Sequence, residues 1–283
     1  MHLRTIITPR VFSIVPLFRQ RRINSLHLKL FIFPTMSKDL TKMVLILAIL
    51  LLSCGCGPGS PTPPPESNTS VTTDTLEVPP PTPLVIAVDT FPIMTEYKLK
   101  LMKDYYRKNY GLDRVTLDSP RMVVIHYTVS PTLRSTLNLF KRDELSKDRT
   151  YIRRFSPLNV SIHYVIDRDG SIHTLMPDSL MARHIIGFNH MAFGIENVAM
   201  NANDLTAAQL SSNLHLVRFL KQRHPGLEYL IGHMEYNDTT LAHFQHFTSL
   251  NPAYRAYGKQ DPGPGFMQAL RDSLATYGLY FAK

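Results

Sequence analysis

Short β-rich segments alternate with helical patterns in the second half of the chain, and this alternation restricts the possible fold more than any other feature. The β-rich runs are 121–128, 160–168, 171–176, 193–199 and 229–231, and the helical patterns are 97–110, 132–142 and the stretch that follows Thr206. Asp169-Gly170 stands between the second and third β runs and predicts a hairpin there. Strands separated by helices predict a single α/β domain with a mixed central β-sheet flanked by helices.

The helical patterns carry recognisable end signals. Apolar and aromatic side chains recur at helical spacing over 97–110, and Gly111 follows them directly. Thr206 and Gln209 have the spacing of a capping box, which predicts a helix start. We interpret the aromatic stripe of the first helix as core rather than as a platform for sugars.

Composition supports one folded domain and argues against a nucleic-acid partner. The chain has 283 residues with 44% apolar content, which is enough for a sizeable core. Its formal net charge of +9 is unevenly distributed, because residues 1–53 hold eight Lys/Arg and one acid, whereas 54–283 hold 23 Lys/Arg and 21 acids. The basicity therefore belongs mainly to the N-terminal segment, and we exclude nucleic acid as a partner.

An apolar run near the N-terminus predicts a processing signal. Residues 43–52 are ten consecutive apolar residues preceded by two lysines, which is typical of a signal peptide and short for a membrane span. The run is followed by Ser53-Cys54, and this junction resembles a bacterial lipoprotein signal in which the cysteine is lipidated. We expect Cys54 to carry a lipid anchor that attaches the chain to a membrane.

The position of this signal divides the chain into four parts. A signal peptide tolerates little sequence ahead of its apolar run, so we expect translation to start at Met36, with 1–35 as an upstream extension and 36–53 as the signal peptide. We interpret 54–85 as a Pro/Ser/Thr-rich linker, because 57–84 holds nine of the 21 prolines and few large apolar residues. Residues 86–283 then form the folded domain, with its core in 121–275.

The cysteines and the residue after the predicted lipidation site add to this picture. The only cysteines are Cys54 and Cys56, so a disulfide cannot staple the folded domain. Gly55 is not the aspartate that keeps some lipoproteins at the inner membrane. We therefore expect a lipoprotein of the cell envelope that faces the periplasm, at the outer membrane rather than the inner one.

A stiff turn near the C-terminus presents a carboxylate. Asp261 precedes Pro262 in a Pro/Gly-rich stretch, and proline restricts both its own φ and the residue before it. Two histidines complete a candidate ligand set, since His126 lies at the end of a buried strand pattern and His233 follows another. Two imidazoles and one carboxylate are typical of a zinc site that keeps a fourth position open. We predict one Zn²⁺ per chain.

These residues belong to an ordered series of segments that resembles a known family. The chain resembles the zinc-dependent N-acetylmuramoyl-L-alanine amidases, a group that also includes the animal peptidoglycan recognition proteins. The resemblance spans 121–275 and is carried by Ile125-His126-Tyr127-Thr128, Ser161 to Gly170, His184 to Asn189, Gly194-Ile195-Glu196, Gly232-His233 and Lys259 to Pro264.

The resemblance implies a role for each residue in these segments. His126, His233 and Asp261 would be the metal ligands, Glu196 the general base, and Lys259 the cation that stabilises the oxyanion. The segment from His184 to Asn189 matches the family's substrate groove, so the resemblance implies that both of these residues bind substrate.

Other histidines have less reactive interpretations. We expect His163 to be structural and to bond within the hairpin. The long stretch 234–258 predicts a lid or groove wall. We interpret its His243 and His246 as surface or packing residues, because no third metal ligand accompanies them.

Two functions remain in competition at this point. The first is a zinc hydrolase that cleaves the amide between N-acetylmuramic acid and L-alanine in peptidoglycan or muropeptides. The alternative is a non-catalytic peptidoglycan-binding lipoprotein, although such a module would have no use for Glu196 and Lys259. A simple envelope tether would explain the N-terminal segments but not the zinc ligands. We predict no protein partner.

Overall fold

The computed structural model describes residues 84–283. The predicted upstream extension (1–35), signal peptide (36–53) and lipidated Cys54, and all but the last two residues of the predicted linker (54–85), lie outside the described residues. Over the described part of the chain, every helix is too short or too polar to serve as a membrane span.

A mixed β-sheet forms the centre of the domain, as predicted, and it has six strands, one more than the five β-rich runs of the sequence. The strands are β1 (Asp89–Thr90), β2 (Met122–Tyr127), β3 (Tyr164–Ile166), β4 (Ile172–Thr174), β5 (Ala192–Asn197) and β6 (Tyr229–Gly232). Their order is β1-β4-β3-β5-β2-β6. The predicted hairpin is confirmed, since β3 and β4 pair antiparallel while every other neighbouring pair is parallel.

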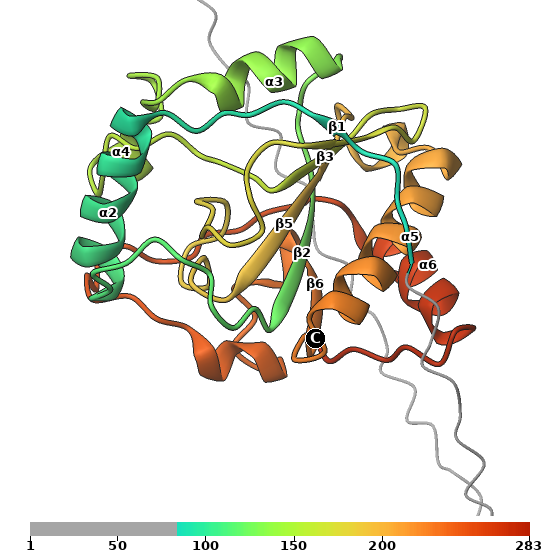
Figure 1. Cartoon of the computed structure of the whole chain (residues 1–283). Helices are drawn as coiled ribbons and strands as arrows, with labels where there is room; N and C mark the ends of the chain where they lie inside the picture. The colour runs from blue at the N-terminus through green and yellow to red at the C-terminus, as the bar shows by residue number, and fades with distance from the viewer. Residues whose placement is uncertain (1–83) are drawn as a thin grey trace, which may run out of the picture. The chain divides into compact units, whose positions relative to one another are not determined.

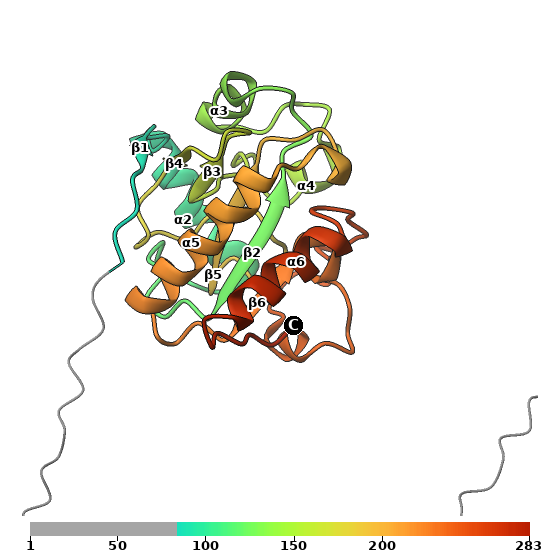
Figure 2. The same cartoon turned by 90° about the vertical axis from the view of Figure 1, so that its right-hand side faces the viewer.

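Helices cover both faces of this sheet (Figures 1 and 2). The α-helices are α2 (Glu96–Tyr110), α3 (Leu133–Lys141), α4 (Thr150–Arg153), α5 (Ala207–Arg223) and α6 (Pro264–Ala275), and the 3₁₀ helices are η1 (Ala202–Asp204), η2 (His233–Glu235) and η3 (Ala242–His246). α5 and α6 contact each other and lie on one face, with α2 on the other. The architecture is therefore an α/β layered domain.

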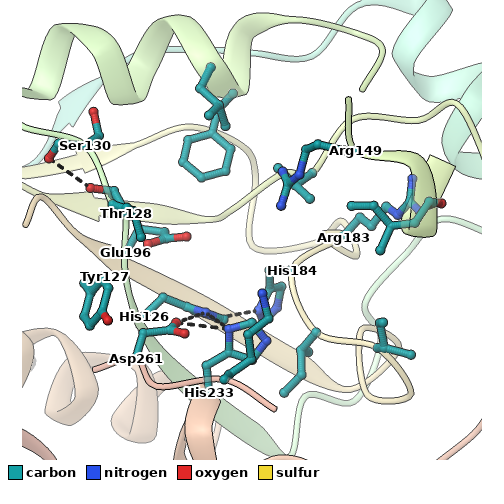
Figure 3. Close-up of a pocket in the computed structure, with 18 of the residues that line it drawn as sticks. His126, Tyr127, Thr128, Ser130, Arg149, Arg183, His184, Glu196, His233 and Asp261 are labelled. Carbon is teal, nitrogen blue, oxygen red and sulfur yellow. Dashed lines mark hydrogen bonds and ion pairs between the residues drawn. The ribbon is translucent and has the colours of Figure 1, made fainter. Parts of the chain in front are cut away.

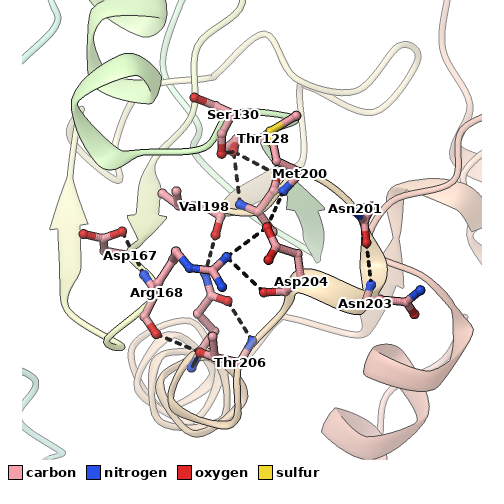
Figure 4. Close-up of polar contacts among 12 residues, drawn as sticks. Thr128, Ser130, Asp167, Arg168, Val198, Met200, Asn201, Asn203, Asp204 and Thr206 are labelled. Carbon is pink, nitrogen blue, oxygen red and sulfur yellow. Dashed lines mark hydrogen bonds and ion pairs between the residues drawn. The ribbon is translucent and has the colours of Figure 1, made fainter.

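The predicted end signals of two helices are confirmed. Gly111 ends α2 in the left-handed conformation, with φ at 72°. The side chain of Thr206 accepts from the Gln209 backbone while the Gln209 side chain accepts from the Thr206 backbone, so α5 begins with a complete capping box. The Thr206 hydroxyl also donates to the Arg168 carbonyl, which connects the start of α5 to the turn between β3 and β4 (Figure 4).

The core lies on both sides of β2 and β5. Residues 122–126 of β2 are all buried, as expected for a central parallel strand. On the α2 side the stripe Tyr105, Tyr106 and Tyr110 is buried, which confirms its assignment to the core. On the other side α6 contributes Met267, Leu270 and Leu274.

Strand register decides which side chains meet at the sheet edge. His126 on β2 is the register partner of Glu196 on β5. β6 runs parallel to β2 on its other side and ends at Gly232, so the next residue, His233, leaves the sheet at the same edge. Carboxyl ends of parallel strands are the usual place for ligand sites in α/β folds.

Candidate active site

Three side chains at this edge point their donor atoms at one another (Figure 3). His126 Nδ1 lies 3.0 Å from His233 Nδ1 and 3.2 Å from Asp261 Oδ2, and His233 Nδ1 lies 3.0 Å from the same oxygen. Donor atoms around tetrahedral zinc lie roughly 3.3 Å apart, given bonds of about 2.0–2.1 Å. The two imidazoles and the carboxylate therefore fit a zinc ion, and among residues 84–283 they form a group of the size and composition that a metal requires.

The turn that holds Asp261 is locked against the end of β6. The Met234 amide donates to the Asp261 carbonyl at 2.8 Å. Gly232 allows this approach, because a Cβ at that position would lie 2.9 Å from Pro262 Cδ and 3.0 Å from Met267 Cγ. The start of α6 and the end of β6 are thus in close contact, which places Asp261 beside His233.

The environment gives His233 and Asp261 the protonation states that a metal needs. Burial, together with the neighbouring His126, lowers the pKa of His233 to about 4, so its ring is neutral at pH 7. Burial opposes ionisation of Asp261, but its contacts with His126 and His233 outweigh it and hold the pKa of Asp261 well below its usual value. A neutral imidazole and an ionised carboxylate are the metal-binding forms.

His184 fixes the orientation of the His126 ring. His184 Nδ1 lies 3.0 Å from His126 Nε2, and His184 Nε2 lies 3.4 Å from the Ala192 carbonyl. Burial, and then the proximity of His126, hold the pKa of His184 well below its usual value, so its ring is neutral and one nitrogen can accept. If His184 donates to Ala192 and accepts from His126 Nε2, then His126 Nδ1 is left free to bind a metal.

Gly194 makes room for this arrangement. A Cβ at Gly194 would lie 2.8 Å from His184 Nδ1 and 2.2 Å from Ile162 Cδ1, distances that real contacts do not show. The absence of a side chain at Gly194 therefore leaves room for His184 beside His126. Glu196, two residues later on β5, lies at the same edge of the sheet.

Glu196 stands at one side of a cavity of about 440 Å³ that also contains the three candidate ligands. Its side chain is partly buried, and its Oε2 has no hydrogen-bond partner. Burial and the nearby Asp261 raise the pKa of Glu196 well above its usual value, whereas Lys259 and Arg149 act in the opposite direction. A raised pKa makes a carboxylate a stronger base and suits it to proton transfer.

Lys259 and Arg149 bring positive charge to the same cavity. Lys259 lines it, with its ammonium 4.7 Å from the centre of the Tyr257 ring. Arg149 points into the cavity from the loop before α4 (Figure 3), and no acidic partner for it is found within residues 84–283. The site thus offers cations to an anionic ligand or intermediate.

Comparison with known proteins identifies the family. A sequence model described as N-acetylmuramoyl-L-alanine amidase matches residues 116–264, just over half of the chain. The chain belongs to this amidase family. The matched range contains all six segments of the resemblance up to Pro264, and with them the three candidate ligands, His184, Glu196 and Lys259. A search of curated protein sequences found no match.

Several solved structures resemble this member of the amidase family. One is the N-acetylmuramoyl-L-alanine amidase LysC from Clostridium intestinale URNW, with 19% identity over 68% of this chain and 99% of that chain and a TM-score of 0.43. A second is hydrolase AmiA of Staphylococcus aureus, with 13% identity, 69% and 86% coverage and a TM-score of 0.41. A third is Drosophila peptidoglycan recognition protein SA, with 21% identity, 45% and 75% coverage and a TM-score of 0.35.

Asn189, predicted to bind substrate, has a different setting from the one expected. It is completely buried, and its carbonyl oxygen accepts from the backbone amides of His184 and Ile185 at 2.9 and 2.8 Å. Its amide nitrogen donates to the hydroxyls of Tyr105 and Tyr110. All four hydrogen-bonding positions of the amide are therefore occupied by this chain. These contacts leave Asn189 no group to offer a substrate, and its role here is to hold the loop that carries His184.

The remaining histidines pack as predicted, with one change of partner. His163 is buried and structural, but it bonds to the Leu180 carbonyl and accepts from the Gly194 amide rather than bonding within the hairpin. His243 is buried 5.3 Å from the Phe188 ring, and His246 Nε2 lies 3.0 Å from the Tyr229 hydroxyl.

The stretch 234–258 forms a wall of the cavity. Tyr236, Tyr254 and Tyr257 of this stretch all line it. Tyr236 accepts from the Tyr257 amide at 2.7 Å and donates to the Tyr257 carbonyl at 2.9 Å, which ties the start of the stretch to its end. Of the two predicted roles, a lid or a groove wall, this stretch has the position of a groove wall.

Two arginines of the cavity were missed by the sequence reasoning. Arg183 is 3% exposed and donates to the carbonyls of Ser156, Leu158 and Ile152, so it braces the loop after α4. Arg149 lies in a charged stretch with no motif. Arg183 directly precedes His184, and this position beside a candidate site residue was the signal for Arg183 that the sequence offered.

Proposed function

We propose that this chain is a zinc-dependent amidase that hydrolyses the bond between the lactyl group of N-acetylmuramic acid and L-alanine in peptidoglycan or muropeptides. One observation carries the proposal: in a chain of this amidase family, two histidines and an aspartate aim their donor atoms at one point beside a carboxyl group that lacks a partner. That arrangement has the chemistry for cleaving an unstrained amide.

His126, His233 and Asp261 would hold the zinc ion. Bound zinc supplies a Lewis acid that makes water a nucleophile near neutral pH and polarises the carbonyl group. His184 keeps the His126 ring in the orientation for this task by bonding to its far nitrogen.

Glu196 is proposed to move the protons of the reaction. It would take a proton from the attacking water and deliver it to the amine of the departing L-alanine. Its raised pKa suits both steps. A carboxyl group with an ordinary pKa is a weak base at pH 7, and it holds a proton too rarely to protonate the amine. The nearby charge of Lys259 would stabilise the carbonyl oxygen as it becomes negative.

The positive charge of Arg149 favours binding of a substrate that carries a carboxylate. Peptidoglycan stem peptides carry carboxylates, and the Arg149 guanidinium enters the cavity without an acidic partner among the described residues. A carboxylate of the bound peptide would supply that partner. We further propose that Cys54 carries a lipid anchor, which would hold the enzyme at the envelope beside this substrate.

Glu196→Gln and Lys259→Met test the proposal against the non-catalytic alternative. Loss of a general base lowers turnover by about 10²- to 10⁴-fold, and loss of one oxyanion donor by about 10²- to 10³-fold. We expect both variants to keep zinc and muropeptide affinity, since the affected interactions act in the transition state. The measurements are turnover of a muramoyl peptide, zinc content and binding on the same samples.

Two results would count against this proposal. Near wild-type turnover of Glu196→Gln would place the base elsewhere. A wild-type protein that binds muropeptide but never cleaves it would establish the recognition module instead.

A further inference from the structure

Val129 adopts a backbone conformation that its side chain disfavours. Its φ is 51°, and among residues 84–283 it is the one residue other than glycine with a positive φ. The left-handed region brings Cβ close to the following carbonyl oxygen, and a β-branched side chain makes this conformation a clear outlier. Outliers of this kind persist where the surrounding structure imposes them, and they concentrate at functional sites.

The two neighbours of Val129 are held by hydrogen bonds to the segment that continues β5. The Thr128 amide donates to the Asn197 carbonyl at 3.0 Å, and the Ser130 amide donates to the Ala199 carbonyl at 3.3 Å. The Ala199 amide in turn donates to the Thr128 hydroxyl at 3.3 Å. These bonds explain why the backbone at 129 keeps its conformation, but glycine or asparagine would satisfy the same backbone at lower strain.

The valine side chain is not used for core packing either. Val129 is 64% exposed, so its isopropyl group is largely in solvent. It lines the same cavity as the candidate metal ligands, and so does Leu139 of α3, which is 40% exposed. A strained, exposed apolar side chain at the wall of this cavity contributes little to the packing of the folded chain. A bound molecule is a partner against which it can pack.

We propose that Val129 contacts the substrate, with its isopropyl group and Leu139 packing against an apolar part of the muramoyl peptide next to the scissile amide. This inference rests on the proposed function. Val129 is three residues after His126, so its Cα lies at most about 10 Å from that of the candidate ligand. The contacted part of the substrate is therefore close to the bond that is cleaved.

Val129→Gly and Val129→Asn separate a substrate contact from a structural role. Both residues accept a positive φ, so relief of strain should raise the unfolding temperature by about 2–4 °C in a domain of this size. Both also remove the apolar group, so KM for a muramoyl peptide should rise about 4- to 15-fold, as for the loss of one or two buried methyl-sized groups. kcat should change little, because the contact exists before and during the reaction.

Val129→Ile is the matched control. It keeps both the strain and the apolar group, so its unfolding temperature and KM should stay close to those of the wild type. A residue with only a structural role would instead lose stability and activity together in the glycine and asparagine variants.

The outcomes distinguish this inference from the proposed function. If the wild type cleaves muramoyl peptide and the glycine and asparagine variants do so with unchanged KM, the amidase proposal stands and the Val129 contact is overturned. Lower unfolding temperatures for both variants would overturn the strain argument. A wild type that neither binds nor cleaves muramoyl peptide would overturn the proposed function, and the contact with it.

Discussion

Replacing His184 by phenylalanine should weaken zinc binding without removing any ligand. Phenylalanine keeps an aromatic ring against Gly194 but cannot accept from His126 Nε2, 3.0 Å away in the wild type. The His126 ring then loses the bond that fixes its orientation and tautomer. Loss of such a partner costs about 10- to 100-fold in metal affinity, which corresponds to about 1.4–2.7 kcal/mol.

Competition with a chromophoric chelator measures this effect directly, with zinc affinity rather than activity as the readout. His184→Gln is the informative partner variant, because its amide oxygen can accept from His126 and should restore part of the affinity. His215→Phe is the control, since His215 is exposed on α5 and lines a different surface depression. Its zinc affinity should equal that of the wild type.

A folded His184→Phe that binds zinc as tightly as the wild type would show that His184 does not orient His126. In that case the His126 orientation would be set by the β2 backbone and by Asp261 alone. Thermal unfolding of the metal-free variant separates this result from a general loss of structure.

Three further predictions concern single residues. Asp261→Ala should lose most of its zinc by metal analysis, because two imidazoles alone leave the ion under-coordinated and without a negative ligand; full occupancy would remove Asp261 from the site. Arg149→Gln should raise KM for a stem peptide that bears a free carboxylate but not for the same peptide amidated, whereas equal effects on both would contradict a carboxylate contact. Cys54→Ala should release the protein from membranes in a fractionation with labelled fatty acid, and a wild type that is unlabelled and soluble would exclude the lipoprotein while leaving the amidase intact.

Much of the sheet could be predicted because its strands are buried on both faces. The apolar run of β2 and the Asp169-Gly170 turn are local signals, and the structure follows both. The runs around β3 and β4 predicted longer strands than the three residues each that form, because β propensity does not reveal where a partner strand ends. α6 was not predicted, although Pro264 at its first turn and apolar residues at helical spacing were present in the sequence.

The site shows the same division between local and non-local information. His126, His233 and Asp261 could be proposed from their positions beside strand ends and in a stiff turn. Asn189 was assigned to substrate because its segment resembles the groove of the family, but its four hydrogen bonds depend on tyrosines about 80 residues away. Val129 could not be found from the sequence, since a positive φ is imposed by pairing between β2 and β5 and leaves no mark on the residue itself.

The three candidate ligands come from strands and a turn that are distant along the chain, and this has a consequence during synthesis. His126 and Asp261 are separated by 135 residues. A ribosome that adds about 5–20 residues per second would need about 7–27 s to make that stretch, so His126 emerges long before a complete site can exist. The three-ligand site cannot be complete before Asp261 has been made, just ahead of α6. Under the proposed function, zinc uptake would therefore come late in domain assembly, and a chain truncated before Asp261 would lack the carboxylate ligand.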